Sequence, residues 1–157
     1  MANPLSGKPE KFFMAAGAAE GPTELNAFDN ALLKAGIGNY NLLKVSSIIP
    51  PGSKMADSVD LPEGSLLPIA YGSVCSSERG RLISAAVAVG LPVDRGCVGI
   101  IAEIAGEFDE DYARQRARYM AEQALITRGC EIKEILVVSS SIEVAGPSCA
   151  FAGVAVW

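Results

Sequence analysis

The sequence predicts a single α+β domain in which two helices cover largely antiparallel sheets. Its 157 residues provide one full hydrophobic core and little room for a second domain. Half of the residues are apolar and 20% are charged, which indicates a compact folded chain. Two stretches show helical spacing, while the others are short apolar segments joined by hairpin-length connections. Because each sheet must bury a face, we expect a layered sandwich.

The first third of the chain predicts one strand followed by one helix. Residues 1–10 are polar and contain prolines, so we expect them on the surface. A short buried strand follows at Lys11–Ala16 and closes at Gly17. From Leu25 to Ala35, apolar residues recur every three or four positions, which indicates one buried face of a helix. Gly36 then provides the helix stop.

A second strand and the longest loop come next. Asn39–Ile49 is rich in apolar and β-branched residues, and it predicts one strand that cannot continue past Pro50-Pro51. Residues 50–65 contain three prolines and two glycines, which predicts a loop. A loop of this length in a small domain is usually mobile or functional.

The remaining sequence predicts five strands and one long helix. The alanines of Arg81–Val89 leave a helix open as an alternative for that stretch. Asp109 can cap a helix from Glu110 to Arg128, which Gly129 ends. The predicted strands are Leu66–Cys75, Arg81–Val89, Val98–Ala105, Ile132–Ser141 and Cys149–Trp157.

Composition excludes several classes of function. Thirteen basic against eighteen acidic residues give a net charge of -5, which argues against a nucleic-acid partner. The chain has no histidine, so serine-histidine triads and imidazole-based zinc sites are excluded, and we expect no metal. The apolar run Leu82–Val93 is too short to cross a membrane. With no signal-peptide pattern, we expect a cytoplasmic protein whose four cysteines are reduced and mostly buried.

The pair Ser46-Ser47 stands directly before Ile48-Ile49-Pro50-Pro51. Taken alone, such a pair is most often structural, with hydroxyls bonded to nearby backbone. The glycine-rich Gly36–Asn39 lacks the lysine and the strand-to-helix order of a phosphate-binding loop. From about Phe13 to Trp157, however, the sequence resembles the pyruvoyl-dependent arginine decarboxylases of archaea and some bacteria. The resemblance is carried by LNAFDNALLKAGIGNYNLLKVSSIIPP, PIAYG, CVGIIAEIAGEF and CAFAGVAVW.

This resemblance implies a proenzyme that cuts its own backbone between Ser46 and Ser47. Residues 1–46 would remain bound as the β chain, and residues 47–157 would form the α chain beginning with a pyruvoyl group made from Ser47. The ketone would form a Schiff base with the substrate amine and act as an electron sink, so no dissociable cofactor is needed. The implied reaction converts L-arginine to agmatine and CO2, at the entry to polyamine synthesis.

The resemblance also implies roles for three further residues. Glu103 matches the proton donor, and its apolar neighbours should raise its pKa. Asn41 matches an asparagine that assists processing or catalysis, and its amide can donate to an oxyanion. Asp29 matches an acid that meets the substrate guanidinium. Read without the resemblance, all three are ordinary solvent-facing polar residues.

Other functions stay open at this point. The same pyruvoyl chemistry could act on another amino acid, because the loop from Gly52 to Glu63 and the residues Tyr40 and Lys44 differ from the family pattern. An uncleaved, non-enzymatic homologue and a structural oligomerisation module are further alternatives. Neither explains why Ser46, Ser47, Asn41 and Glu103 occur together. The resemblance implies a homotrimer with active sites between protomers.

Overall fold

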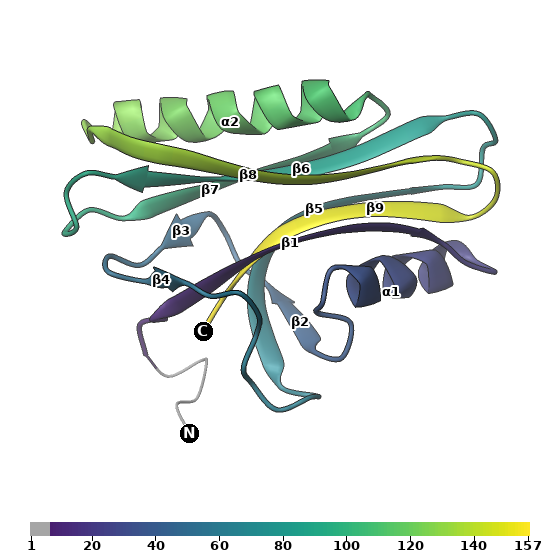
Figure 1. The fold of residues 1–157 in the computed structure, drawn as a ribbon, viewed down its shortest axis with the longest axis horizontal. Helices are drawn as coiled ribbons and strands as arrows, with labels where there is room; N and C mark the ends of the chain where they lie inside the picture. The colour runs from purple at the N-terminus through teal and green to yellow at the C-terminus, as the bar shows by residue number, and fades with distance from the viewer. Residues whose placement is uncertain (1–6) are drawn as a thin grey trace.

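The computed structural model describes residues 7–157 and arranges them in four layers, with one helix on each outer side of two stacked sheets (Figure 1). The predicted α+β single-domain sandwich is therefore confirmed. Of the predicted surface segment, residues 1–6 lie outside the described part. The elements in chain order are β1 (Lys11–Glu20), α1 (Glu24–Lys34), β2 (Asn41–Lys44), β3 (Ile48–Ile49), β4 (Lys54–Met55), β5 (Leu66–Ser76), β6 (Leu82–Pro92), β7 (Gly99–Gly106), α2 (Glu110–Thr127), β8 (Ile132–Glu143) and β9 (Ser148–Val156).

The two sheets are mostly antiparallel, as the short connections predicted. The first has the strand order β2-β5-β9-β1-β4, and the second has the order β3-β7-β6-β8. Among the strands of residues 7–157, parallel pairing occurs only where β1 meets β4 and where β2 meets β5. Between the sheets lies a core of valines, isoleucines and alanines that includes Val87, Ile101 and Val154. This core fixes how the edges of the two sheets face each other.

The alanine-rich stretch around β6 is a strand, so the helical alternative for it is wrong. β6 is buried on both faces because it lies between the inter-sheet core and α2. Its Ala86 and Ala88 face α2 and pack against Ala113 and Ala117. Small side chains allow the helix to lie close to the sheet, so packing and not helix propensity explains the alanines.

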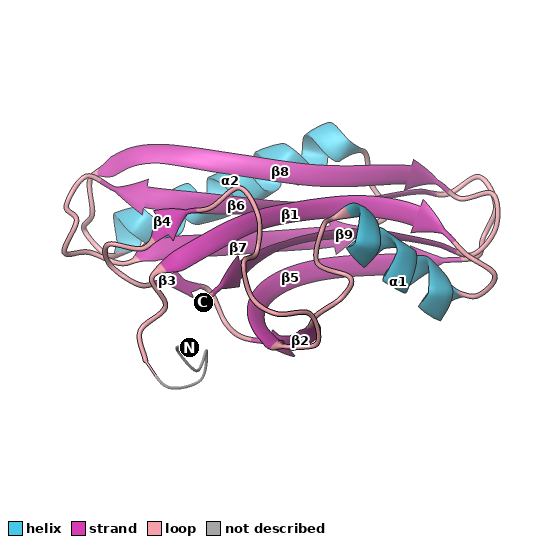
Figure 2. Ribbon diagram, turned by 60° about the horizontal axis from the view of Figure 1, so that its bottom comes forward, coloured by secondary structure: helices cyan, strands magenta, loops and turns pink. Residues whose placement is uncertain are grey.

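β1 continues to Glu20 and does not end at Gly17. Gly17 lies within the strand, where it allows α1 to pack closely against β1. α1 packs on β1 and β9 on the outer side of the first sheet (Figure 2). A side chain at Gly17 would meet the carbonyl of Ala31 and come within 2.9 Å of the amide of Ala35. Glycine is therefore required for the close approach of helix and strand.

We expect Gly17→Ala to lower the free energy of unfolding by about 1–3 kcal/mol, because the added methyl group has to displace α1. Urea denaturation followed by circular dichroism measures this change. Gly146→Ala is the matched control, because no atom lies within 4 Å of a side chain placed there. Equal midpoints for both variants would show that α1 can move away freely.

The predicted strand Asn39–Ile49 is wrong as a single element. β2 ends at Lys44 and belongs to the first sheet, where it pairs with β5. β3 begins at Ile48 and belongs to the second sheet, where it pairs with β7. The chain crosses from one sheet to the other over residues 45–47. The serine pair therefore lies in this crossing and not at the end of a strand.

The expectation of four reduced cysteines is also wrong. Cys75 on β5 and Cys149 on β9 stand directly opposite each other, with 4.1 Å between their Cα atoms, and form a disulfide. Cys97 and Cys130 are free thiols. The pairing depends on the register of two strands far apart in sequence, which cysteine spacing does not reveal. Within residues 7–157, no helix has the length and apolar character needed to cross a membrane.

Candidate active site

The crossing at residues 45–47 is held to a different sheet at each end. Before the serines, the amide of Val45 donates to the carbonyl of Ile69 on β5, at 3.0 Å. After them, the amide of Ile101 on β7 donates to the carbonyl of Ser47, at 2.8 Å. Ser46 is exposed and Ser47 is half-buried. The backbone on both sides of the Ser46–Ser47 peptide is thus fixed, while the Ser46 side chain stays exposed to solvent.

Glu103 lies on the same strand as Ile101 and faces the same way. The two residues are two positions apart on β7, so their side chains point to one side of the sheet, about 7 Å apart along the strand. Glu103 pairs with Val87, whose side chain belongs to the core between the sheets. β3 pairs with β7 only at Ile100 and Gly99, so it ends before it reaches Glu103. The carboxyl therefore faces the seam between the sheets next to the crossing.

Burial raises the pKa of the half-buried Glu103 above the usual range of a carboxyl group. The positive charge of Lys44 and a hydrogen bond from the glutamate's own backbone oppose this rise. The predicted effect of apolar surroundings on its pKa is confirmed. A raised pKa keeps more of the acid protonated near neutral pH, which suits a proton donor.

Lys44 and Tyr71 are neighbours of the crossing for which the sequence predicted no role. The Lys44 ammonium lies 4.5 Å from the centroid of the Tyr71 ring. Tyr71 in turn packs against Phe28 of α1 and Phe151 of β9. The aromatic cluster holds Lys44 just before the serine pair, and its charge acts on Glu103. The signal in the sequence was a lone cation two residues before Ser46 in an apolar strand.

Asn41 does not lie beside the serine pair of its own chain. It begins β2, and Val45 continues in register, so about 13 Å of extended strand separate the two positions. Its amide donates to the carbonyl of Gly64, at 2.7 Å. At alternate positions after it lie Leu43 on β2 and Val45 just beyond β2, which are 40% and 36% exposed. Asn41 thus begins an apolar row on an outer strand.

Asp29 is likewise apart from the serines. It occupies the exposed side of α1, and in residues 7–157 its carboxylate makes no hydrogen bond or ion pair. Leu25 and Leu33, one turn before and one turn after it, are 77% and 51% exposed. Residues four apart share one face of a helix. Asp29 therefore stands between two exposed leucines on one stripe of α1.

Comparison with known proteins matches this fold and sequence to one group. In the solved structure of a pyruvoyl-dependent histidine decarboxylase at pH 8, a similar fold covers 64% of this chain and 54% of that one, with a TM-score of 0.50 and 15% identity. The family model for pyruvoyl-dependent arginine decarboxylase matches residues 11–154. A protein of that name from Methanocaldococcus jannaschii is 42% identical over 95% of this chain and 90% of its own length. Another from Pyrococcus abyssi is 46% identical over 93% of this chain and 94% of its own length.

The fold is that of a pyruvoyl-dependent decarboxylase. The chain belongs to the pyruvoyl-dependent arginine decarboxylase family, so the family predicted from the sequence is confirmed. Its cofactor is a covalently bound pyruvoyl group.

The residues at the crossing fit this group. A serine supplies the atoms of a pyruvoyl group, and Ser47 follows an accessible peptide and has its own carbonyl fixed by Ile101. A cut before Ser47 would leave both parts in place. β1 pairs with β9 continuously from Phe12 to Glu20, and β3 remains on β7.

Proposed function

We propose that the seam around the crossing is the active site in which this chain decarboxylates L-arginine to agmatine and CO2. The observation that carries the proposal is the Ser46–Ser47 peptide, fixed to two different sheets, with Glu103 facing the same seam. Incubation of the purified protein with arginine labelled at the carboxyl carbon tests it, through released CO2 and agmatine measured by mass spectrometry. Release of CO2 from another amino acid in preference to arginine would instead indicate a pyruvoyl-dependent decarboxylase with a different substrate.

The first step is self-cleavage by the chain's own serines. The Ser47 Oγ attacks the carbonyl carbon of Ser46, and the C–N bond breaks, which converts the peptide into an ester. Removal of the Ser47 α-proton expels the Ser46 carboxylate and leaves a double bond between Cα and Cβ. Water then replaces the amino nitrogen, which leaves as ammonia, and the ketone of the pyruvoyl group results. Residues 1–46 and 47–157 become two chains held in one fold by β1 and β9.

When formed, the pyruvoyl group supplies an electron sink for the loss of CO2 from the substrate. Glu103 provides what that group lacks, a proton for the substrate Cα once the carboxylate has left. Burial raises the pKa of this carboxyl, so a larger fraction of it carries that proton near neutral pH. The positive charge of Lys44 opposes this rise in the pKa of Glu103.

Asp29 and Asn41 enter the proposal through a second copy of the chain. Both residues sit within exposed apolar rows, on α1 and on the outer strand β2, away from the serines of their own chain. Exposed leucines on such rows favour burial against another copy. In the proposed homotrimer, each site takes Ser47 and Glu103 from one protomer and Asp29 and Asn41 from the next. The Asp29 carboxylate then binds the substrate guanidinium through two parallel hydrogen bonds.

Subunit complementation tests the shared site. We expect Asp29→Asn and Glu103→Gln each to be nearly inactive alone, because each removes one half of every site. When the two variants are co-expressed in equal amounts and assemble at random, about a quarter of the sites carry both native residues, so about a quarter of the activity returns.

The control is each variant co-expressed with itself, which should stay inactive. Light scattering on the same samples gives the size of the assembly and should report a trimer. If the mixture stays inactive while mixed trimers are present, both residues act within one chain. The proposed shared site would then be wrong, although the decarboxylase assignment would stand.

A further inference from the structure

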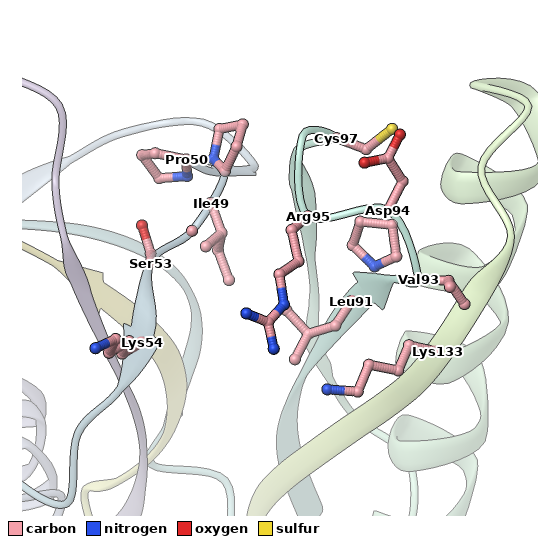
Figure 3. Close-up of a pocket in the computed structure, with 14 residues that line it drawn as sticks. Ile49, Pro50, Ser53, Lys54, Leu91, Val93, Asp94, Arg95, Cys97 and Lys133 are labelled. Atoms are coloured by element: carbon pink, nitrogen blue, oxygen red, sulfur yellow. The ribbon is translucent and has the colours of Figure 1, made fainter.

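A cavity lies on the other side of β3 from the crossing (Figure 3). It has a volume of about 570 Å³. One wall is the turn between β3 and β4, and the other is the turn between β6 and β7 with the start of β8. None of Ser46, Ser47 and Glu103 lines it. The cavity is therefore separate from the proposed active site.

Three cationic side chains from different elements line this cavity. Lys54 belongs to β4, Arg95 to the turn after β6, and Lys133 to β8. Figure 3 shows Arg95 and Lys133 extending into the gap, with Lys54 on the opposite wall. Among residues 7–157, the ion pairs are formed by Lys11 and Arg81, and none involves these three cations. The cavity thus gathers uncompensated positive charge on a chain whose net charge is -5.

The one carboxylate among the lining residues does not neutralise them. Asp94 accepts a hydrogen bond from the amide of Gly96 in its own turn, at 2.8 Å. Figure 3 shows its carboxylate beside Cys97, turned away from the guanidinium of Arg95. The floor of the cavity is apolar and includes Ile49 and Leu91. An apolar floor strengthens the field of nearby charges because it excludes water.

We propose that this cavity binds a small multivalent oxyanion, bearing phosphate or several carboxylate groups, between Arg95, Lys133 and Lys54. Two cationic side chains that extend into the gap, with a third cation on the facing wall, fit an anion with several charged oxygens better than they fit a single carboxylate. Ile49 and Lys54 belong to the segment that follows Ser47 directly. The bound anion therefore bridges this segment to the start of β8.

Titration calorimetry with inorganic pyrophosphate, and separately with citrate, tests the proposal on the full processed protein. We expect at least one of them to bind with a Kd at or below about 1 mM at physiological salt and to raise the Tm. Pyrophosphate binding alone identifies a phosphate site, and citrate binding alone identifies a polycarboxylate site. Absence of heat with both probes, and of any rise in Tm, would overturn the proposal.

Arg95→Gln/Lys133→Gln should weaken binding by about tenfold or more, because it removes two charge-assisted contacts. Arg79→Gln/Arg116→Gln removes the same charge from exposed positions elsewhere and should bind like the wild type. Arg95→Lys/Lys133→Arg keeps the charge and should restore most of the binding, which separates lost contacts from faulty folding.

Equal weakening of binding in both Gln variants would show attraction by net charge only. A change of oligomeric state in Arg95→Gln/Lys133→Gln would assign the cations to a subunit contact. Either result would overturn the site.

Discussion

We expect Ser47→Ala to yield an uncut chain of 157 residues that has no decarboxylase activity. Alanine lacks the hydroxyl that attacks the carbonyl of Ser46, so neither the ester nor the pyruvoyl group can form. The fold should persist, because in residues 7–157 the Ser47 side chain makes no hydrogen bond and its carbonyl still accepts from Ile101. Intact mass spectrometry measures whether the chain is cut, and circular dichroism measures whether the fold persists.

Ser46→Ala is the matched control for this variant. It keeps the attacking hydroxyl of Ser47 and the carbonyl that is attacked, and it removes only an exposed side chain. We expect it to split into residues 1–46 and 47–157 and to retain activity. Cleavage of Ser47→Ala at the same peptide would remove Ser47 as the nucleophile and with it the proposed origin of the ketone.

Glu103→Gln should cleave normally but lose about 10²–10⁴-fold in kcat, the usual contribution of a positioned general acid. An amide has nearly the same shape as the acid, so substrate binding and KM should change little. Glu143→Gln, at the exposed end of β8, is a control that changes the same charge away from the seam. Steady-state kinetics on the processed protein gives both constants, and an unchanged kcat in Glu103→Gln would exclude it as the proton donor.

The pH dependence of kcat follows from the raised pKa of Glu103. A proton donor must be protonated, so activity is full below the pKa of the folded state and falls as the pH rises through it. Lys44→Met removes a charge that lowers this pKa, so the alkaline limb should move to higher pH. Glu103→Gln should lose that limb altogether. A limb that stays in place in both variants would belong to another group.

The free energy of unfolding should depend on pH in the same direction as kcat, falling as the pH rises through the pKa of Glu103. Because the folded-state pKa of Glu103 lies above its unfolded value, this residue contributes stability that is present at low pH and is lost as the pH rises through the folded pKa. Glu103→Gln should flatten this part of the stability curve. Urea denaturation at several pH values measures it.

The sequence by itself determined the class of fold, the helices and the chemistry of the proposed site. Apolar spacing in Leu25–Ala35 and Glu110–Arg128 located both helices to within a residue or two, because helix periodicity is local. The roles predicted for Ser46-Ser47 and Glu103 came from the resemblance to the family, because the serine pair taken alone is most often structural. The predicted cytoplasmic location and the roles of Asn41 and Asp29 stay predictions.

Only the tertiary structure decided where the chain changes sheets and which residues meet there. Ile69 and Ile101, whose backbone groups hold the two ends of the crossing, lie far from the serines in sequence, so no local pattern could predict the break in Asn39–Ile49. The same holds for the disulfide between Cys75 and Cys149, which depends on strand register. Long-range backbone pairing, and not side-chain composition, sets such positions, because each strand takes its place from its partner.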